Sequence, residues 1–389
     1  MAVMMGLGII APLMPLYAKN MGASGLWLGI IFSSYSLSRL IFVPMMGKMS
    51  DKNGRKKIIA IGLLLYSIFS LAYVFATNVY ALTFVRFLQG FASAMTLPII
   101  MTYIGDISPK GQEGKYMGYF NVSRFLGLGF GPFLGGVLND FYGIDSAFYA
   151  LSALTGFAFL LTLFYLQEEE GFLKEKKEKP KPSFKKLFQN RIMRGVMIFR
   201  FVSALGRGSI FAFLAIYAFS YGISALKVGI IIAANMLFLS FLQIPFGKMA
   251  DRFSKLKIIV FSGFITVISL ILMPFTGNFY LLLLLNILWG SGRAMGIPAT
   301  TAINTMIGRK HGMGSSTAMF MTAMYAGMVV APLISGVLME TIGIRFVFIF
   351  AGIFTLAGVL IFYFLVRSTD LNHAADYISK REKTHEIIE

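Results

Sequence analysis

The feature that most limits the fold of this chain is a series of twelve apolar stretches, each of a length suited to crossing a bilayer. A transmembrane helix needs about 20 predominantly apolar residues. Because lipid offers the backbone no hydrogen-bond partners, such stretches fold as helices. The predicted spans are residues 1–18, 26–46, 58–77, 79–104, 114–139, 144–166, 192–220, 225–246, 256–276, 279–307, 312–339 and 343–366. We therefore expect an all-α integral membrane protein.

The composition agrees with a membrane protein and excludes several kinds of site. Hydrophobic residues make up 57% of the 389 residues and charged residues only 13%, whereas soluble domains carry about 25% charged residues. The absence of cysteine excludes disulfides, thiol catalysis and cysteine-based metal sites. The three histidines include no pair at metal-ligand spacing, so we expect neither a metal nor a cofactor.

The net charge of +18 is concentrated in alternate links between the spans. Cations gather after the second, fourth, sixth, eighth and tenth spans, whereas the other side carries only Lys19, Lys227 and Arg345. Cationic loops stay in the cytoplasm, so we expect a multi-pass protein of the plasma membrane with both termini in the cytoplasm. The charge indicates topology, and we expect the lipid bilayer rather than nucleic acid as the partner.

The two halves of the chain align at a constant offset of 200 residues. The matching pairs include Tyr17 and Tyr217, Gly29 and Gly229, Gly90 and Gly290, Pro132 and Pro332, and Gly136 and Gly336. Such an offset across several spans indicates a duplication. It predicts two pseudo-symmetric six-helix bundles, at 1–166 and 192–366, with a cytoplasmic linker at 167–191 and a cytoplasmic tail at 367–389. Two such bundles are the architecture of an alternating-access carrier.

The loop after the second span resembles the motif G-x-x-x-D-(R/K)-x-G-(R/K)-(R/K) of the major facilitator superfamily. The matching residues are Gly47, Asp51, Lys52, Gly54, Arg55 and Lys56. The second copy keeps Gly247, Asp251 and Arg252 but has Ser254 in place of the second glycine. The resemblance covers nearly the whole chain and implies that both copies control conformation, with the first steadying an outward-facing state against span 11. A plain cationic loop is the alternative.

The fourth span resembles the family motif L-x-x-x-R-x-x-Q-G at Leu82, Arg86, Gln89 and Gly90. On a helix, Arg86 and Gln89 share a polar face with Ser93. A membrane arginine is costly unless it faces a cavity or a partner, which makes it a candidate functional residue. The resemblance links Arg86 to proton transfer. Because arginine stays protonated, it would act through a neighbouring group or a water. A structural arginine is the alternative.

The fifth span matches the family motif G-x-x-x-G-P-x-x-G-G at Gly127, Gly131, Pro132, Gly135 and Gly136. Glycines at this spacing make a smooth packing face, and the proline bends the helix. In the family this motif marks exporters, above all the twelve-span drug–proton antiporters, so the resemblance implies export. A glycine packing face without a role in export is the alternative.

Polar residues inside the spans define a candidate cavity for substrate or protons. They are Arg86, Gln89, Asn121, Arg124, Arg207, Asn286 and Arg293. All seventeen acidic residues lie in loops, tails or span ends. A cavity with arginines and no buried acid favours anionic or neutral cargo.

The sequence therefore predicts a secondary active transporter rather than an enzyme, because it contains no ATP-binding loop and no catalytic constellation. We expect a monomer that exports small amphiphilic or organic solutes, as in multidrug or metabolite efflux, with protons as the candidate coupling ion. Two alternatives stay open. One is an anion or metabolite carrier or exchanger that is not coupled to protons, and the other is a non-transporting membrane receptor or lipid scramblase.

Overall fold

The computed structural model of the chain describes residues 1–108, 113–167, 184–311 and 313–367, and all regular structure in these ranges is helical. The first half contains α1 (Ala2–Ile10), α2 (Met14–Asn20), α3 (Gly25–Asn53), α4 (Arg55–Ala72), α5 (Val79–Ala94), α6 (Leu97–Ile107), α7 (Glu113–Tyr142) and α8 (Ile144–Tyr165). The second half contains α9 (Phe184–Gln189), α10 (Arg191–Phe219), α11 (Ala225–Arg252), α12 (Lys255–Leu272), the 3-10 turn η2 (Met273–Phe275), α13 (Phe279–His311), α14 (Met313–Thr341) and α15 (Ile344–Val366).

Most of these helices are long and apolar enough to cross a membrane. Within the described residues, nine helical segments meet that standard by length and composition, and α1 with α2 forms a tenth that is bent by 45°. The remaining two long helices are α4, which begins with three cations, and α7, which is rich in glycine. When α4 and α7 are included, the helices follow the predicted order of the spans. The predicted all-α membrane fold is therefore confirmed. Most of the predicted linker and tail lies outside the described residues.

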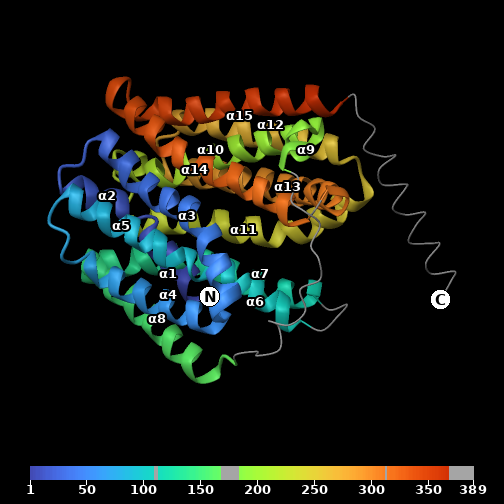
Figure 1. Cartoon of the computed structure of the whole chain (residues 1–389). Coiled ribbons are helices and arrows are strands. Elements are labelled where there is room, and N and C mark those ends of the chain that lie inside the picture. The colour runs from blue at the N-terminus through green and yellow to red at the C-terminus, as the bar shows by residue number, and fades with distance from the viewer. Residues whose placement is uncertain (109–112, 168–183, 312, 368–389) are drawn as a thin grey trace.

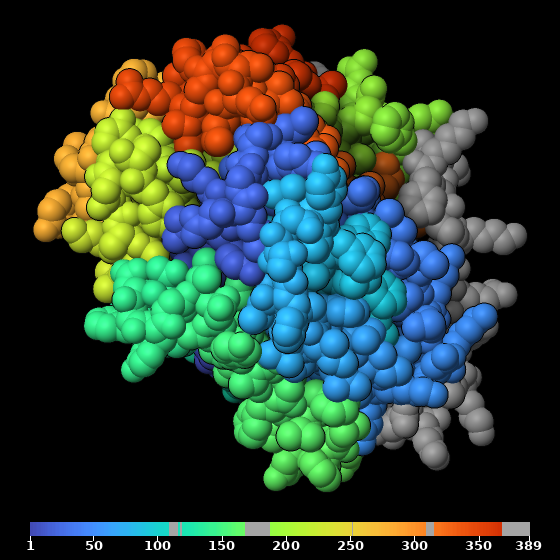
Figure 2. Space-filling view, turned by 90° about the vertical axis from the view of Figure 1, so that its left-hand side faces the viewer, coloured from blue at the N-terminus to red at the C-terminus, as the bar shows by residue number. Residues whose placement is uncertain are grey.

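The helices form two bundles that lie against each other (Figure 1). The first bundle runs from blue to green and the second from yellow-green to red. The most extensive contacts between them are those of α3 with α14 and of α7 with α11. Figure 2 looks at the end that carries the α2–α3 link, where the surfaces of the two halves meet.

The duplication extends to side-chain contacts. The ring of Tyr17 packs edge-on against Phe148 at 5.0 Å, and Tyr217 packs against Phe348 at 5.2 Å. The Tyr17 hydroxyl donates to the backbone oxygens of Tyr73 and Ala76, and the Tyr217 hydroxyl donates to that of Thr276. These matching contacts hold α2 to the end of α4 in the first bundle, and α10 to the end of η2 in the second.

The symmetry fails at two spans. The fourth span breaks between α5 and α6, where Thr96 leaves helical geometry and Pro98 lies in the first turn of the new helix. Its counterpart α13 runs unbroken through Pro298. The first span also breaks, into α1 and α2, whereas α10 is continuous. The equivalent prolines therefore have different effects in their two settings.

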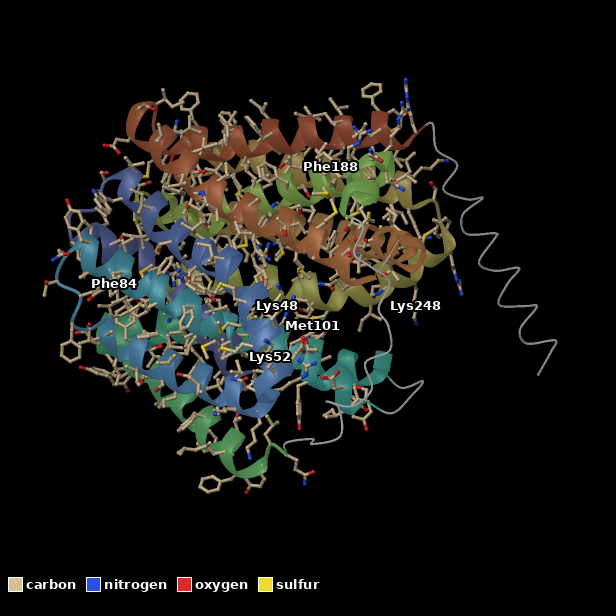
Figure 3. All side chains as sticks on the ribbon, viewed as in Figure 1. Lys48, Lys52, Phe84, Met101, Phe188 and Lys248 are labelled. Atoms are coloured by element: carbon tan, nitrogen blue, oxygen red, sulfur yellow. The ribbon has the colours of Figure 1, made fainter. Side chains whose placement is uncertain are left out.

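Many large apolar side chains lie on the outside of the bundles. Phe84 is 63% exposed (Figure 3), and Phe75 and Phe164 are each 79% exposed. In water such a surface would be unfavourable, but in a bilayer it faces hydrocarbon tails. The exposed apolar surface therefore agrees with a membrane-embedded fold.

Candidate functional site

The two ends of the molecule differ in their links. We call the end with the α3–α4 and α11–α12 links the basic end, because it carries Lys48, Lys52 and Lys248 (Figure 3). We call the end with the α2–α3, α7–α8, α10–α11 and α14–α15 links the far end. The predicted gating residues lie at the basic end, and the predicted cavity residues lie between the two ends.

At the basic end, Arg55 joins two carboxylates. It forms an ion pair with Asp51 Oδ1 at 3.1 Å and donates through Nε to Asp106 Oδ2, at the end of α6. Gly54, at φ 87°, makes the turn that places Arg55 beside Asp51. Arg55, a residue of the predicted motif, therefore links Asp51 to the end of α6, and Asp106 joins the candidate site.

Among the described residues, the side chains of the motif loop form no hydrogen bond or ion pair with the second bundle. Asp51 is 63% exposed, and a Cβ at Gly47 or at Gly247 would have open space around it. Lys52 and Arg252 are exposed, and the side chain of Asp251 lies outside the described residues. The contact with span 11 that the resemblance implies is therefore a prediction for another conformation.

At the far end, the bundles meet backbone to backbone. A Cβ at Gly25 of α3 would lie 2.5 Å from the carbonyl oxygen of Gly336 of α14. One turn further, Gly29 packs against the carbonyl of Pro332. Contacts this close exclude any side chain, so glycine is required at both positions.

The second seam, between α7 and α11, repeats this arrangement. A Cβ at Gly136 would lie 2.6 Å from the Cα of Leu226, and Gly229 packs against the carbonyl of Pro132. The other predicted packing glycines of α7, Gly127, Gly131 and Gly135, face the backbone of α1 instead. The glycine motif thus packs α7 on two helices, one in its own bundle and one in the other.

Two carboxylates cap helices of the opposite bundle at the far end. Glu340 Oε2 accepts a hydrogen bond from the backbone N–H of Leu26 at 3.1 Å, and Asp140 Oδ2 accepts one from that of Leu226, also at 3.1 Å. Both N–H groups belong to the first turn of a helix, where negative charge is favoured. Sequence reasoning missed these two residues, although their spacing of 200 was visible.

The far end also carries a charged contact near the surface. Arg345 donates to the Tyr221 hydroxyl at 2.9 Å. This hydrogen bond and the charge of Arg345 lower the pKa of the Tyr221 hydroxyl from its ordinary value. Tyr221 and Arg345 both belong to the second bundle, so the contact joins the α10–α11 link to the start of α15.

In the first bundle, the predicted pair Arg86 and Gln89 is brought together. Arg86 is 6% exposed, and its Nη1 donates to Gln89 Oε1 at 3.1 Å. The Tyr73 hydroxyl donates to the same oxygen at 2.7 Å. The guanidinium also lies 5.1 Å from the ring centroid of Tyr35, a distance that suits a cation–π contact. Arg86 is therefore held by groups of its own bundle.

Five other arginines lie near one another, Arg39 and Arg124 in the first bundle and Arg200, Arg207 and Arg293 in the second. Charge repulsion couples Arg207 to Arg39 and Arg124 of the first bundle, and Arg293 to Arg200 and Arg207 of the second. Arg39 Nη2 donates to the Tyr325 hydroxyl at 3.0 Å, which joins α3 to α14. We call these five residues the arginine cluster.

Two arginines of the cluster have weak acceptors as partners. Arg200 donates to Met324 Sδ at 3.1 Å and Arg207 to Met328 Sδ. Thioether sulfur is a poor acceptor for a cation. The described acidic side chains, Asp51, Asp106, Asp140, Asp145 and Glu340, all lie at helix ends or in links. The cluster therefore keeps capacity to bind a negative charge.

The two predicted amide residues lie elsewhere. Asn286 is buried and donates to the Leu282 carbonyl of its own helix, while its backbone carbonyl accepts from Asn235 of α11. Asn121 is exposed on α7. No group of three His, Asp or Glu side chains suited to a metal occurs in the described part of the chain.

Comparison with known proteins identifies the family. The model of the Major Facilitator Superfamily matches residues 1–201 and 196–386, nearly the whole chain in two halves. The chain belongs to the major facilitator superfamily. Members of this superfamily are membrane transporters, so the chain is a transporter and not an enzyme.

Among curated superfamily members, the chain is 32% identical over 365 residues to an uncharacterized MFS-type transporter of Methanocaldococcus jannaschii, covering 92% of this chain and 94% of the relative. It is 28% identical over 362 residues to the quinolone resistance protein NorA of Staphylococcus aureus, covering 92% of each chain.

Solved transporter structures share the fold. A bacterial homolog of the human lysosomal transporter Spinster, in an inward-facing and unoccupied conformation, superposes with a TM-score of 0.82 at 12% identity, over 94% of each chain. The nucleoside transporter NupG superposes with a TM-score of 0.79 at 16% identity, over 94% of this chain and 98% of its own. At these identities the likeness shows the fold alone.

Proposed function

We propose that this transporter exports small amphiphilic organic solutes by alternating access, and that it prefers solutes with an acidic group. The observation that carries the proposal is the arginine cluster. Its charges come from both bundles and repel one another, and no described carboxylate lies at that depth. An anionic solute between the bundles would relieve that repulsion.

The surroundings of the cluster suit an amphiphile. Phe320 lies 4.6 Å from the Arg200 guanidinium, and Met324 and Met328 contact Arg200 and Arg207. Aromatic and thioether groups give an adaptable apolar surface next to the charges. A solute with an aromatic body and an acidic group would satisfy both parts of this surface.

The proposed direction of transport is argued from the membrane topology and from the relatives of this chain. We assign the basic end to the cytoplasm, because cationic links stay there, and place the transporter in the plasma membrane with both termini inside. The seams at the far end then close the outer side, so that the cluster loads from the cytoplasm. The complete glycine motif of α7 and the relatives named for quinolone resistance favour export. Quinolones are planar aromatic acids, which fits the cluster.

Alternating access requires the far-end seams to part while the basic end closes. In that second state we expect Asp51 to face the beginning of α14, as the family resemblance implies. We expect a monomer to suffice, because one chain supplies both bundles. The candidate energy source is exchange with protons.

A second candidate is an anion exchanger that is not coupled to protons. The lack of a described carboxylate at the depth of the cluster favours it, because arginine itself does not release a proton at physiological pH. Proteoliposomes separate the two candidates. An imposed pH gradient drives solute accumulation by a proton antiporter and leaves the exchanger unaffected.

The preference for an acidic group is tested with matched solutes. A fluorescent quinolone, its methyl ester and a quaternary ammonium dye of similar size are loaded into proteoliposomes, and efflux rates are compared. We expect the acid to leave fastest. Arg207→Gln should reduce the rate for the acid by about 10- to 100-fold, because a hydrogen bond to a charged group contributes about 1.5–3 kcal/mol.

The control for Arg207→Gln is Arg345→Gln, which removes an arginine at the far-end surface. It should leave the order of rates unchanged. A wild-type protein that moves the quaternary ammonium dye faster than the acid would contradict the proposed preference. A protein that moves none of the three solutes, although folded, would instead support a receptor or scramblase.

A further inference from the structure

A small pocket lies inside the second bundle. Helices α10, α12, α13 and α15 all contribute to its wall, and the first bundle contributes nothing. Its volume of ≈ 10 Å³ suits one particle of about the size of water. The lining residues that the argument uses are Arg200, Ser203, Thr266, Arg293, Thr300 and Thr355.

Arg293 enters this pocket with unused hydrogen-bond donors. The residue is 7% exposed, yet its Nε and Nη1 have no partner among the described residues. Its guanidinium lies 4.5 Å from the ring centroid of Trp289, which covers one face of the cation. A buried guanidinium with unpaired N–H groups is unfavourable. The pocket is the space in which a partner can sit.

The pocket also lacks a negative charge. Arg200 lines it with Arg293, and the Nε of Arg200 is likewise without a partner. No Asp or Glu is among the lining residues. A water molecule would satisfy hydrogen bonds but would leave the repulsion between Arg200 and Arg293 unchanged. A monovalent anion would accept the N–H groups and also offset one of the two charges.

The size and polarity of the pocket select the kind of anion. A carboxylate has three heavy atoms and exceeds a space for one particle. Hydroxyl groups of the wall now donate to helix carbonyls, as Thr300 does to Gly296 and Thr355 to Ala351. Because hydroxyl protons rotate, these groups can turn toward an anion. Among anions, a monatomic halide comes nearest to this size and polarity, and chloride, which is somewhat larger than a water molecule, is the abundant halide in cells.

We propose that this pocket is a chloride-binding site, in which the ion accepts hydrogen bonds from Arg293 and Arg200 and offsets one of their two charges. The proposal goes beyond export, because the ion is held within one bundle and is not the cargo. The first bundle has no arginine at the position equivalent to Arg293. The residue equivalent to Arg293 is Ser93, whose Oγ accepts a hydrogen bond from the Tyr35 hydroxyl at 2.8 Å. Bound chloride would let the second bundle keep two arginines in its interior.

The test measures halide binding to the purified full chain. The protein is prepared in gluconate, an anion too large for the pocket, and titrated with chloride or bromide at constant ionic strength while the melting temperature is recorded. We expect a saturable rise in melting temperature with both halides. Arg293→Ser, which restores the residue of the first bundle, should remove the rise. Arg367→Gln, which removes a cation at the end of α15, should keep it.

A second measurement needs no variant. A crystal grown in bromide should show an anomalous scattering peak between Arg293 and Arg200. The proposal would be overturned if gluconate stabilised the protein as much as the halides do. It would also be overturned if the saturable rise in melting temperature persisted in folded Arg293→Ser. A water molecule at the site in the bromide crystal would likewise overturn it. If Arg293→Ser does not fold, the bromide peak alone decides.

Discussion

The two ends of the molecule use the same helices in different ways. On α3, Gly25 and Gly29 press against the backbone of α14 at the far end, whereas a Cβ at Gly47 would meet only open space. On α11, Gly229 presses against α7, and a Cβ at Gly247 would again meet open space. The far end is closed between the bundles, and the glycines of the basic end have no such partner.

The difference shows that each end is controlled by a different kind of interaction. The far end depends on backbone contacts between bundles, which fall off within a few tenths of an ångström. The basic end depends on ion pairs inside one bundle, which act over longer distances and are weakened by salt. A rocking motion can therefore break the far-end seams without disturbing the cluster around Arg55.

The largest expected effect comes from filling a far-end seam. Gly336→Leu places side-chain atoms against the backbone of Gly25, and overpacking of this kind costs about 1–3 kcal/mol. This free energy corresponds to a shift of about 5- to 150-fold in the equilibrium between the two conformations. Because the chain has no cysteine, Ser33→Cys gives a single labelling site on the seam, beside Val329. Maleimide labelling should rise in Gly336→Leu.

The control for this prediction is Gly247→Leu, which introduces the same side chain where there is room. It should leave labelling at position 33 unchanged. Unchanged labelling in Gly336→Leu would show that the far-end seam does not set the conformation.

A smaller effect is expected at the basic end. Arg55→Gln removes the link between Asp51 and Asp106, and the loss should be about 1 kcal/mol because the pair is partly exposed. We expect a lower melting temperature in low salt, with little change in labelling at position 33. Lys56→Gln, which removes the neighbouring cation of the same motif, is the matched control. A large rise in labelling in Arg55→Gln would mean that the two ends are coupled in this conformation.

The smallest effect is expected from the capping carboxylates. Asp140→Asn and Glu340→Gln keep an amide oxygen that can accept from the Leu226 or Leu26 N–H but remove the charge. A charge near a helix N-terminus contributes about 0.3–1 kcal/mol, so each variant should raise labelling at position 33 by about 2- to 5-fold. Added salt should reduce the difference from wild type. Asp145→Asn, at the start of α8, should not alter labelling, and an effect independent of salt would rule out the electrostatic explanation.

Much of the candidate site could be predicted because it depends on local spacing. Arg86 and Gln89 are three residues apart on one helix, so they share a face in any packing, and the structure confirms their contact. The duplication paired Tyr17 with Tyr217 in the sequence, and the structure gives the two residues equivalent contacts. The resemblance to the superfamily, which rested on motifs within single loops or spans, is confirmed by the family match.

The remaining contacts join residues that are far apart in the sequence. Asp106 lies 51 residues from Arg55, and Glu340 lies 314 residues from Leu26. No local pattern specifies such pairs, because they depend on how helices pack and on which conformation the bundles adopt. The pocket beside Arg293 needs four helices to enclose it, so its existence could not be read from span 10 alone.

The sequence by itself determined the membrane spans, their order, the duplication and the family, because apolar length and short motifs act locally. Only the tertiary structure decided which seams are closed, that Arg55 is the cation between two carboxylates, and that the arginines of the second bundle lack counter-charges. The physical reason is that burial and pairing belong to surfaces made by several helices together. One helix supplies each arginine, and the neighbouring helices determine whether that arginine has a hydrogen-bond partner or a counter-charge.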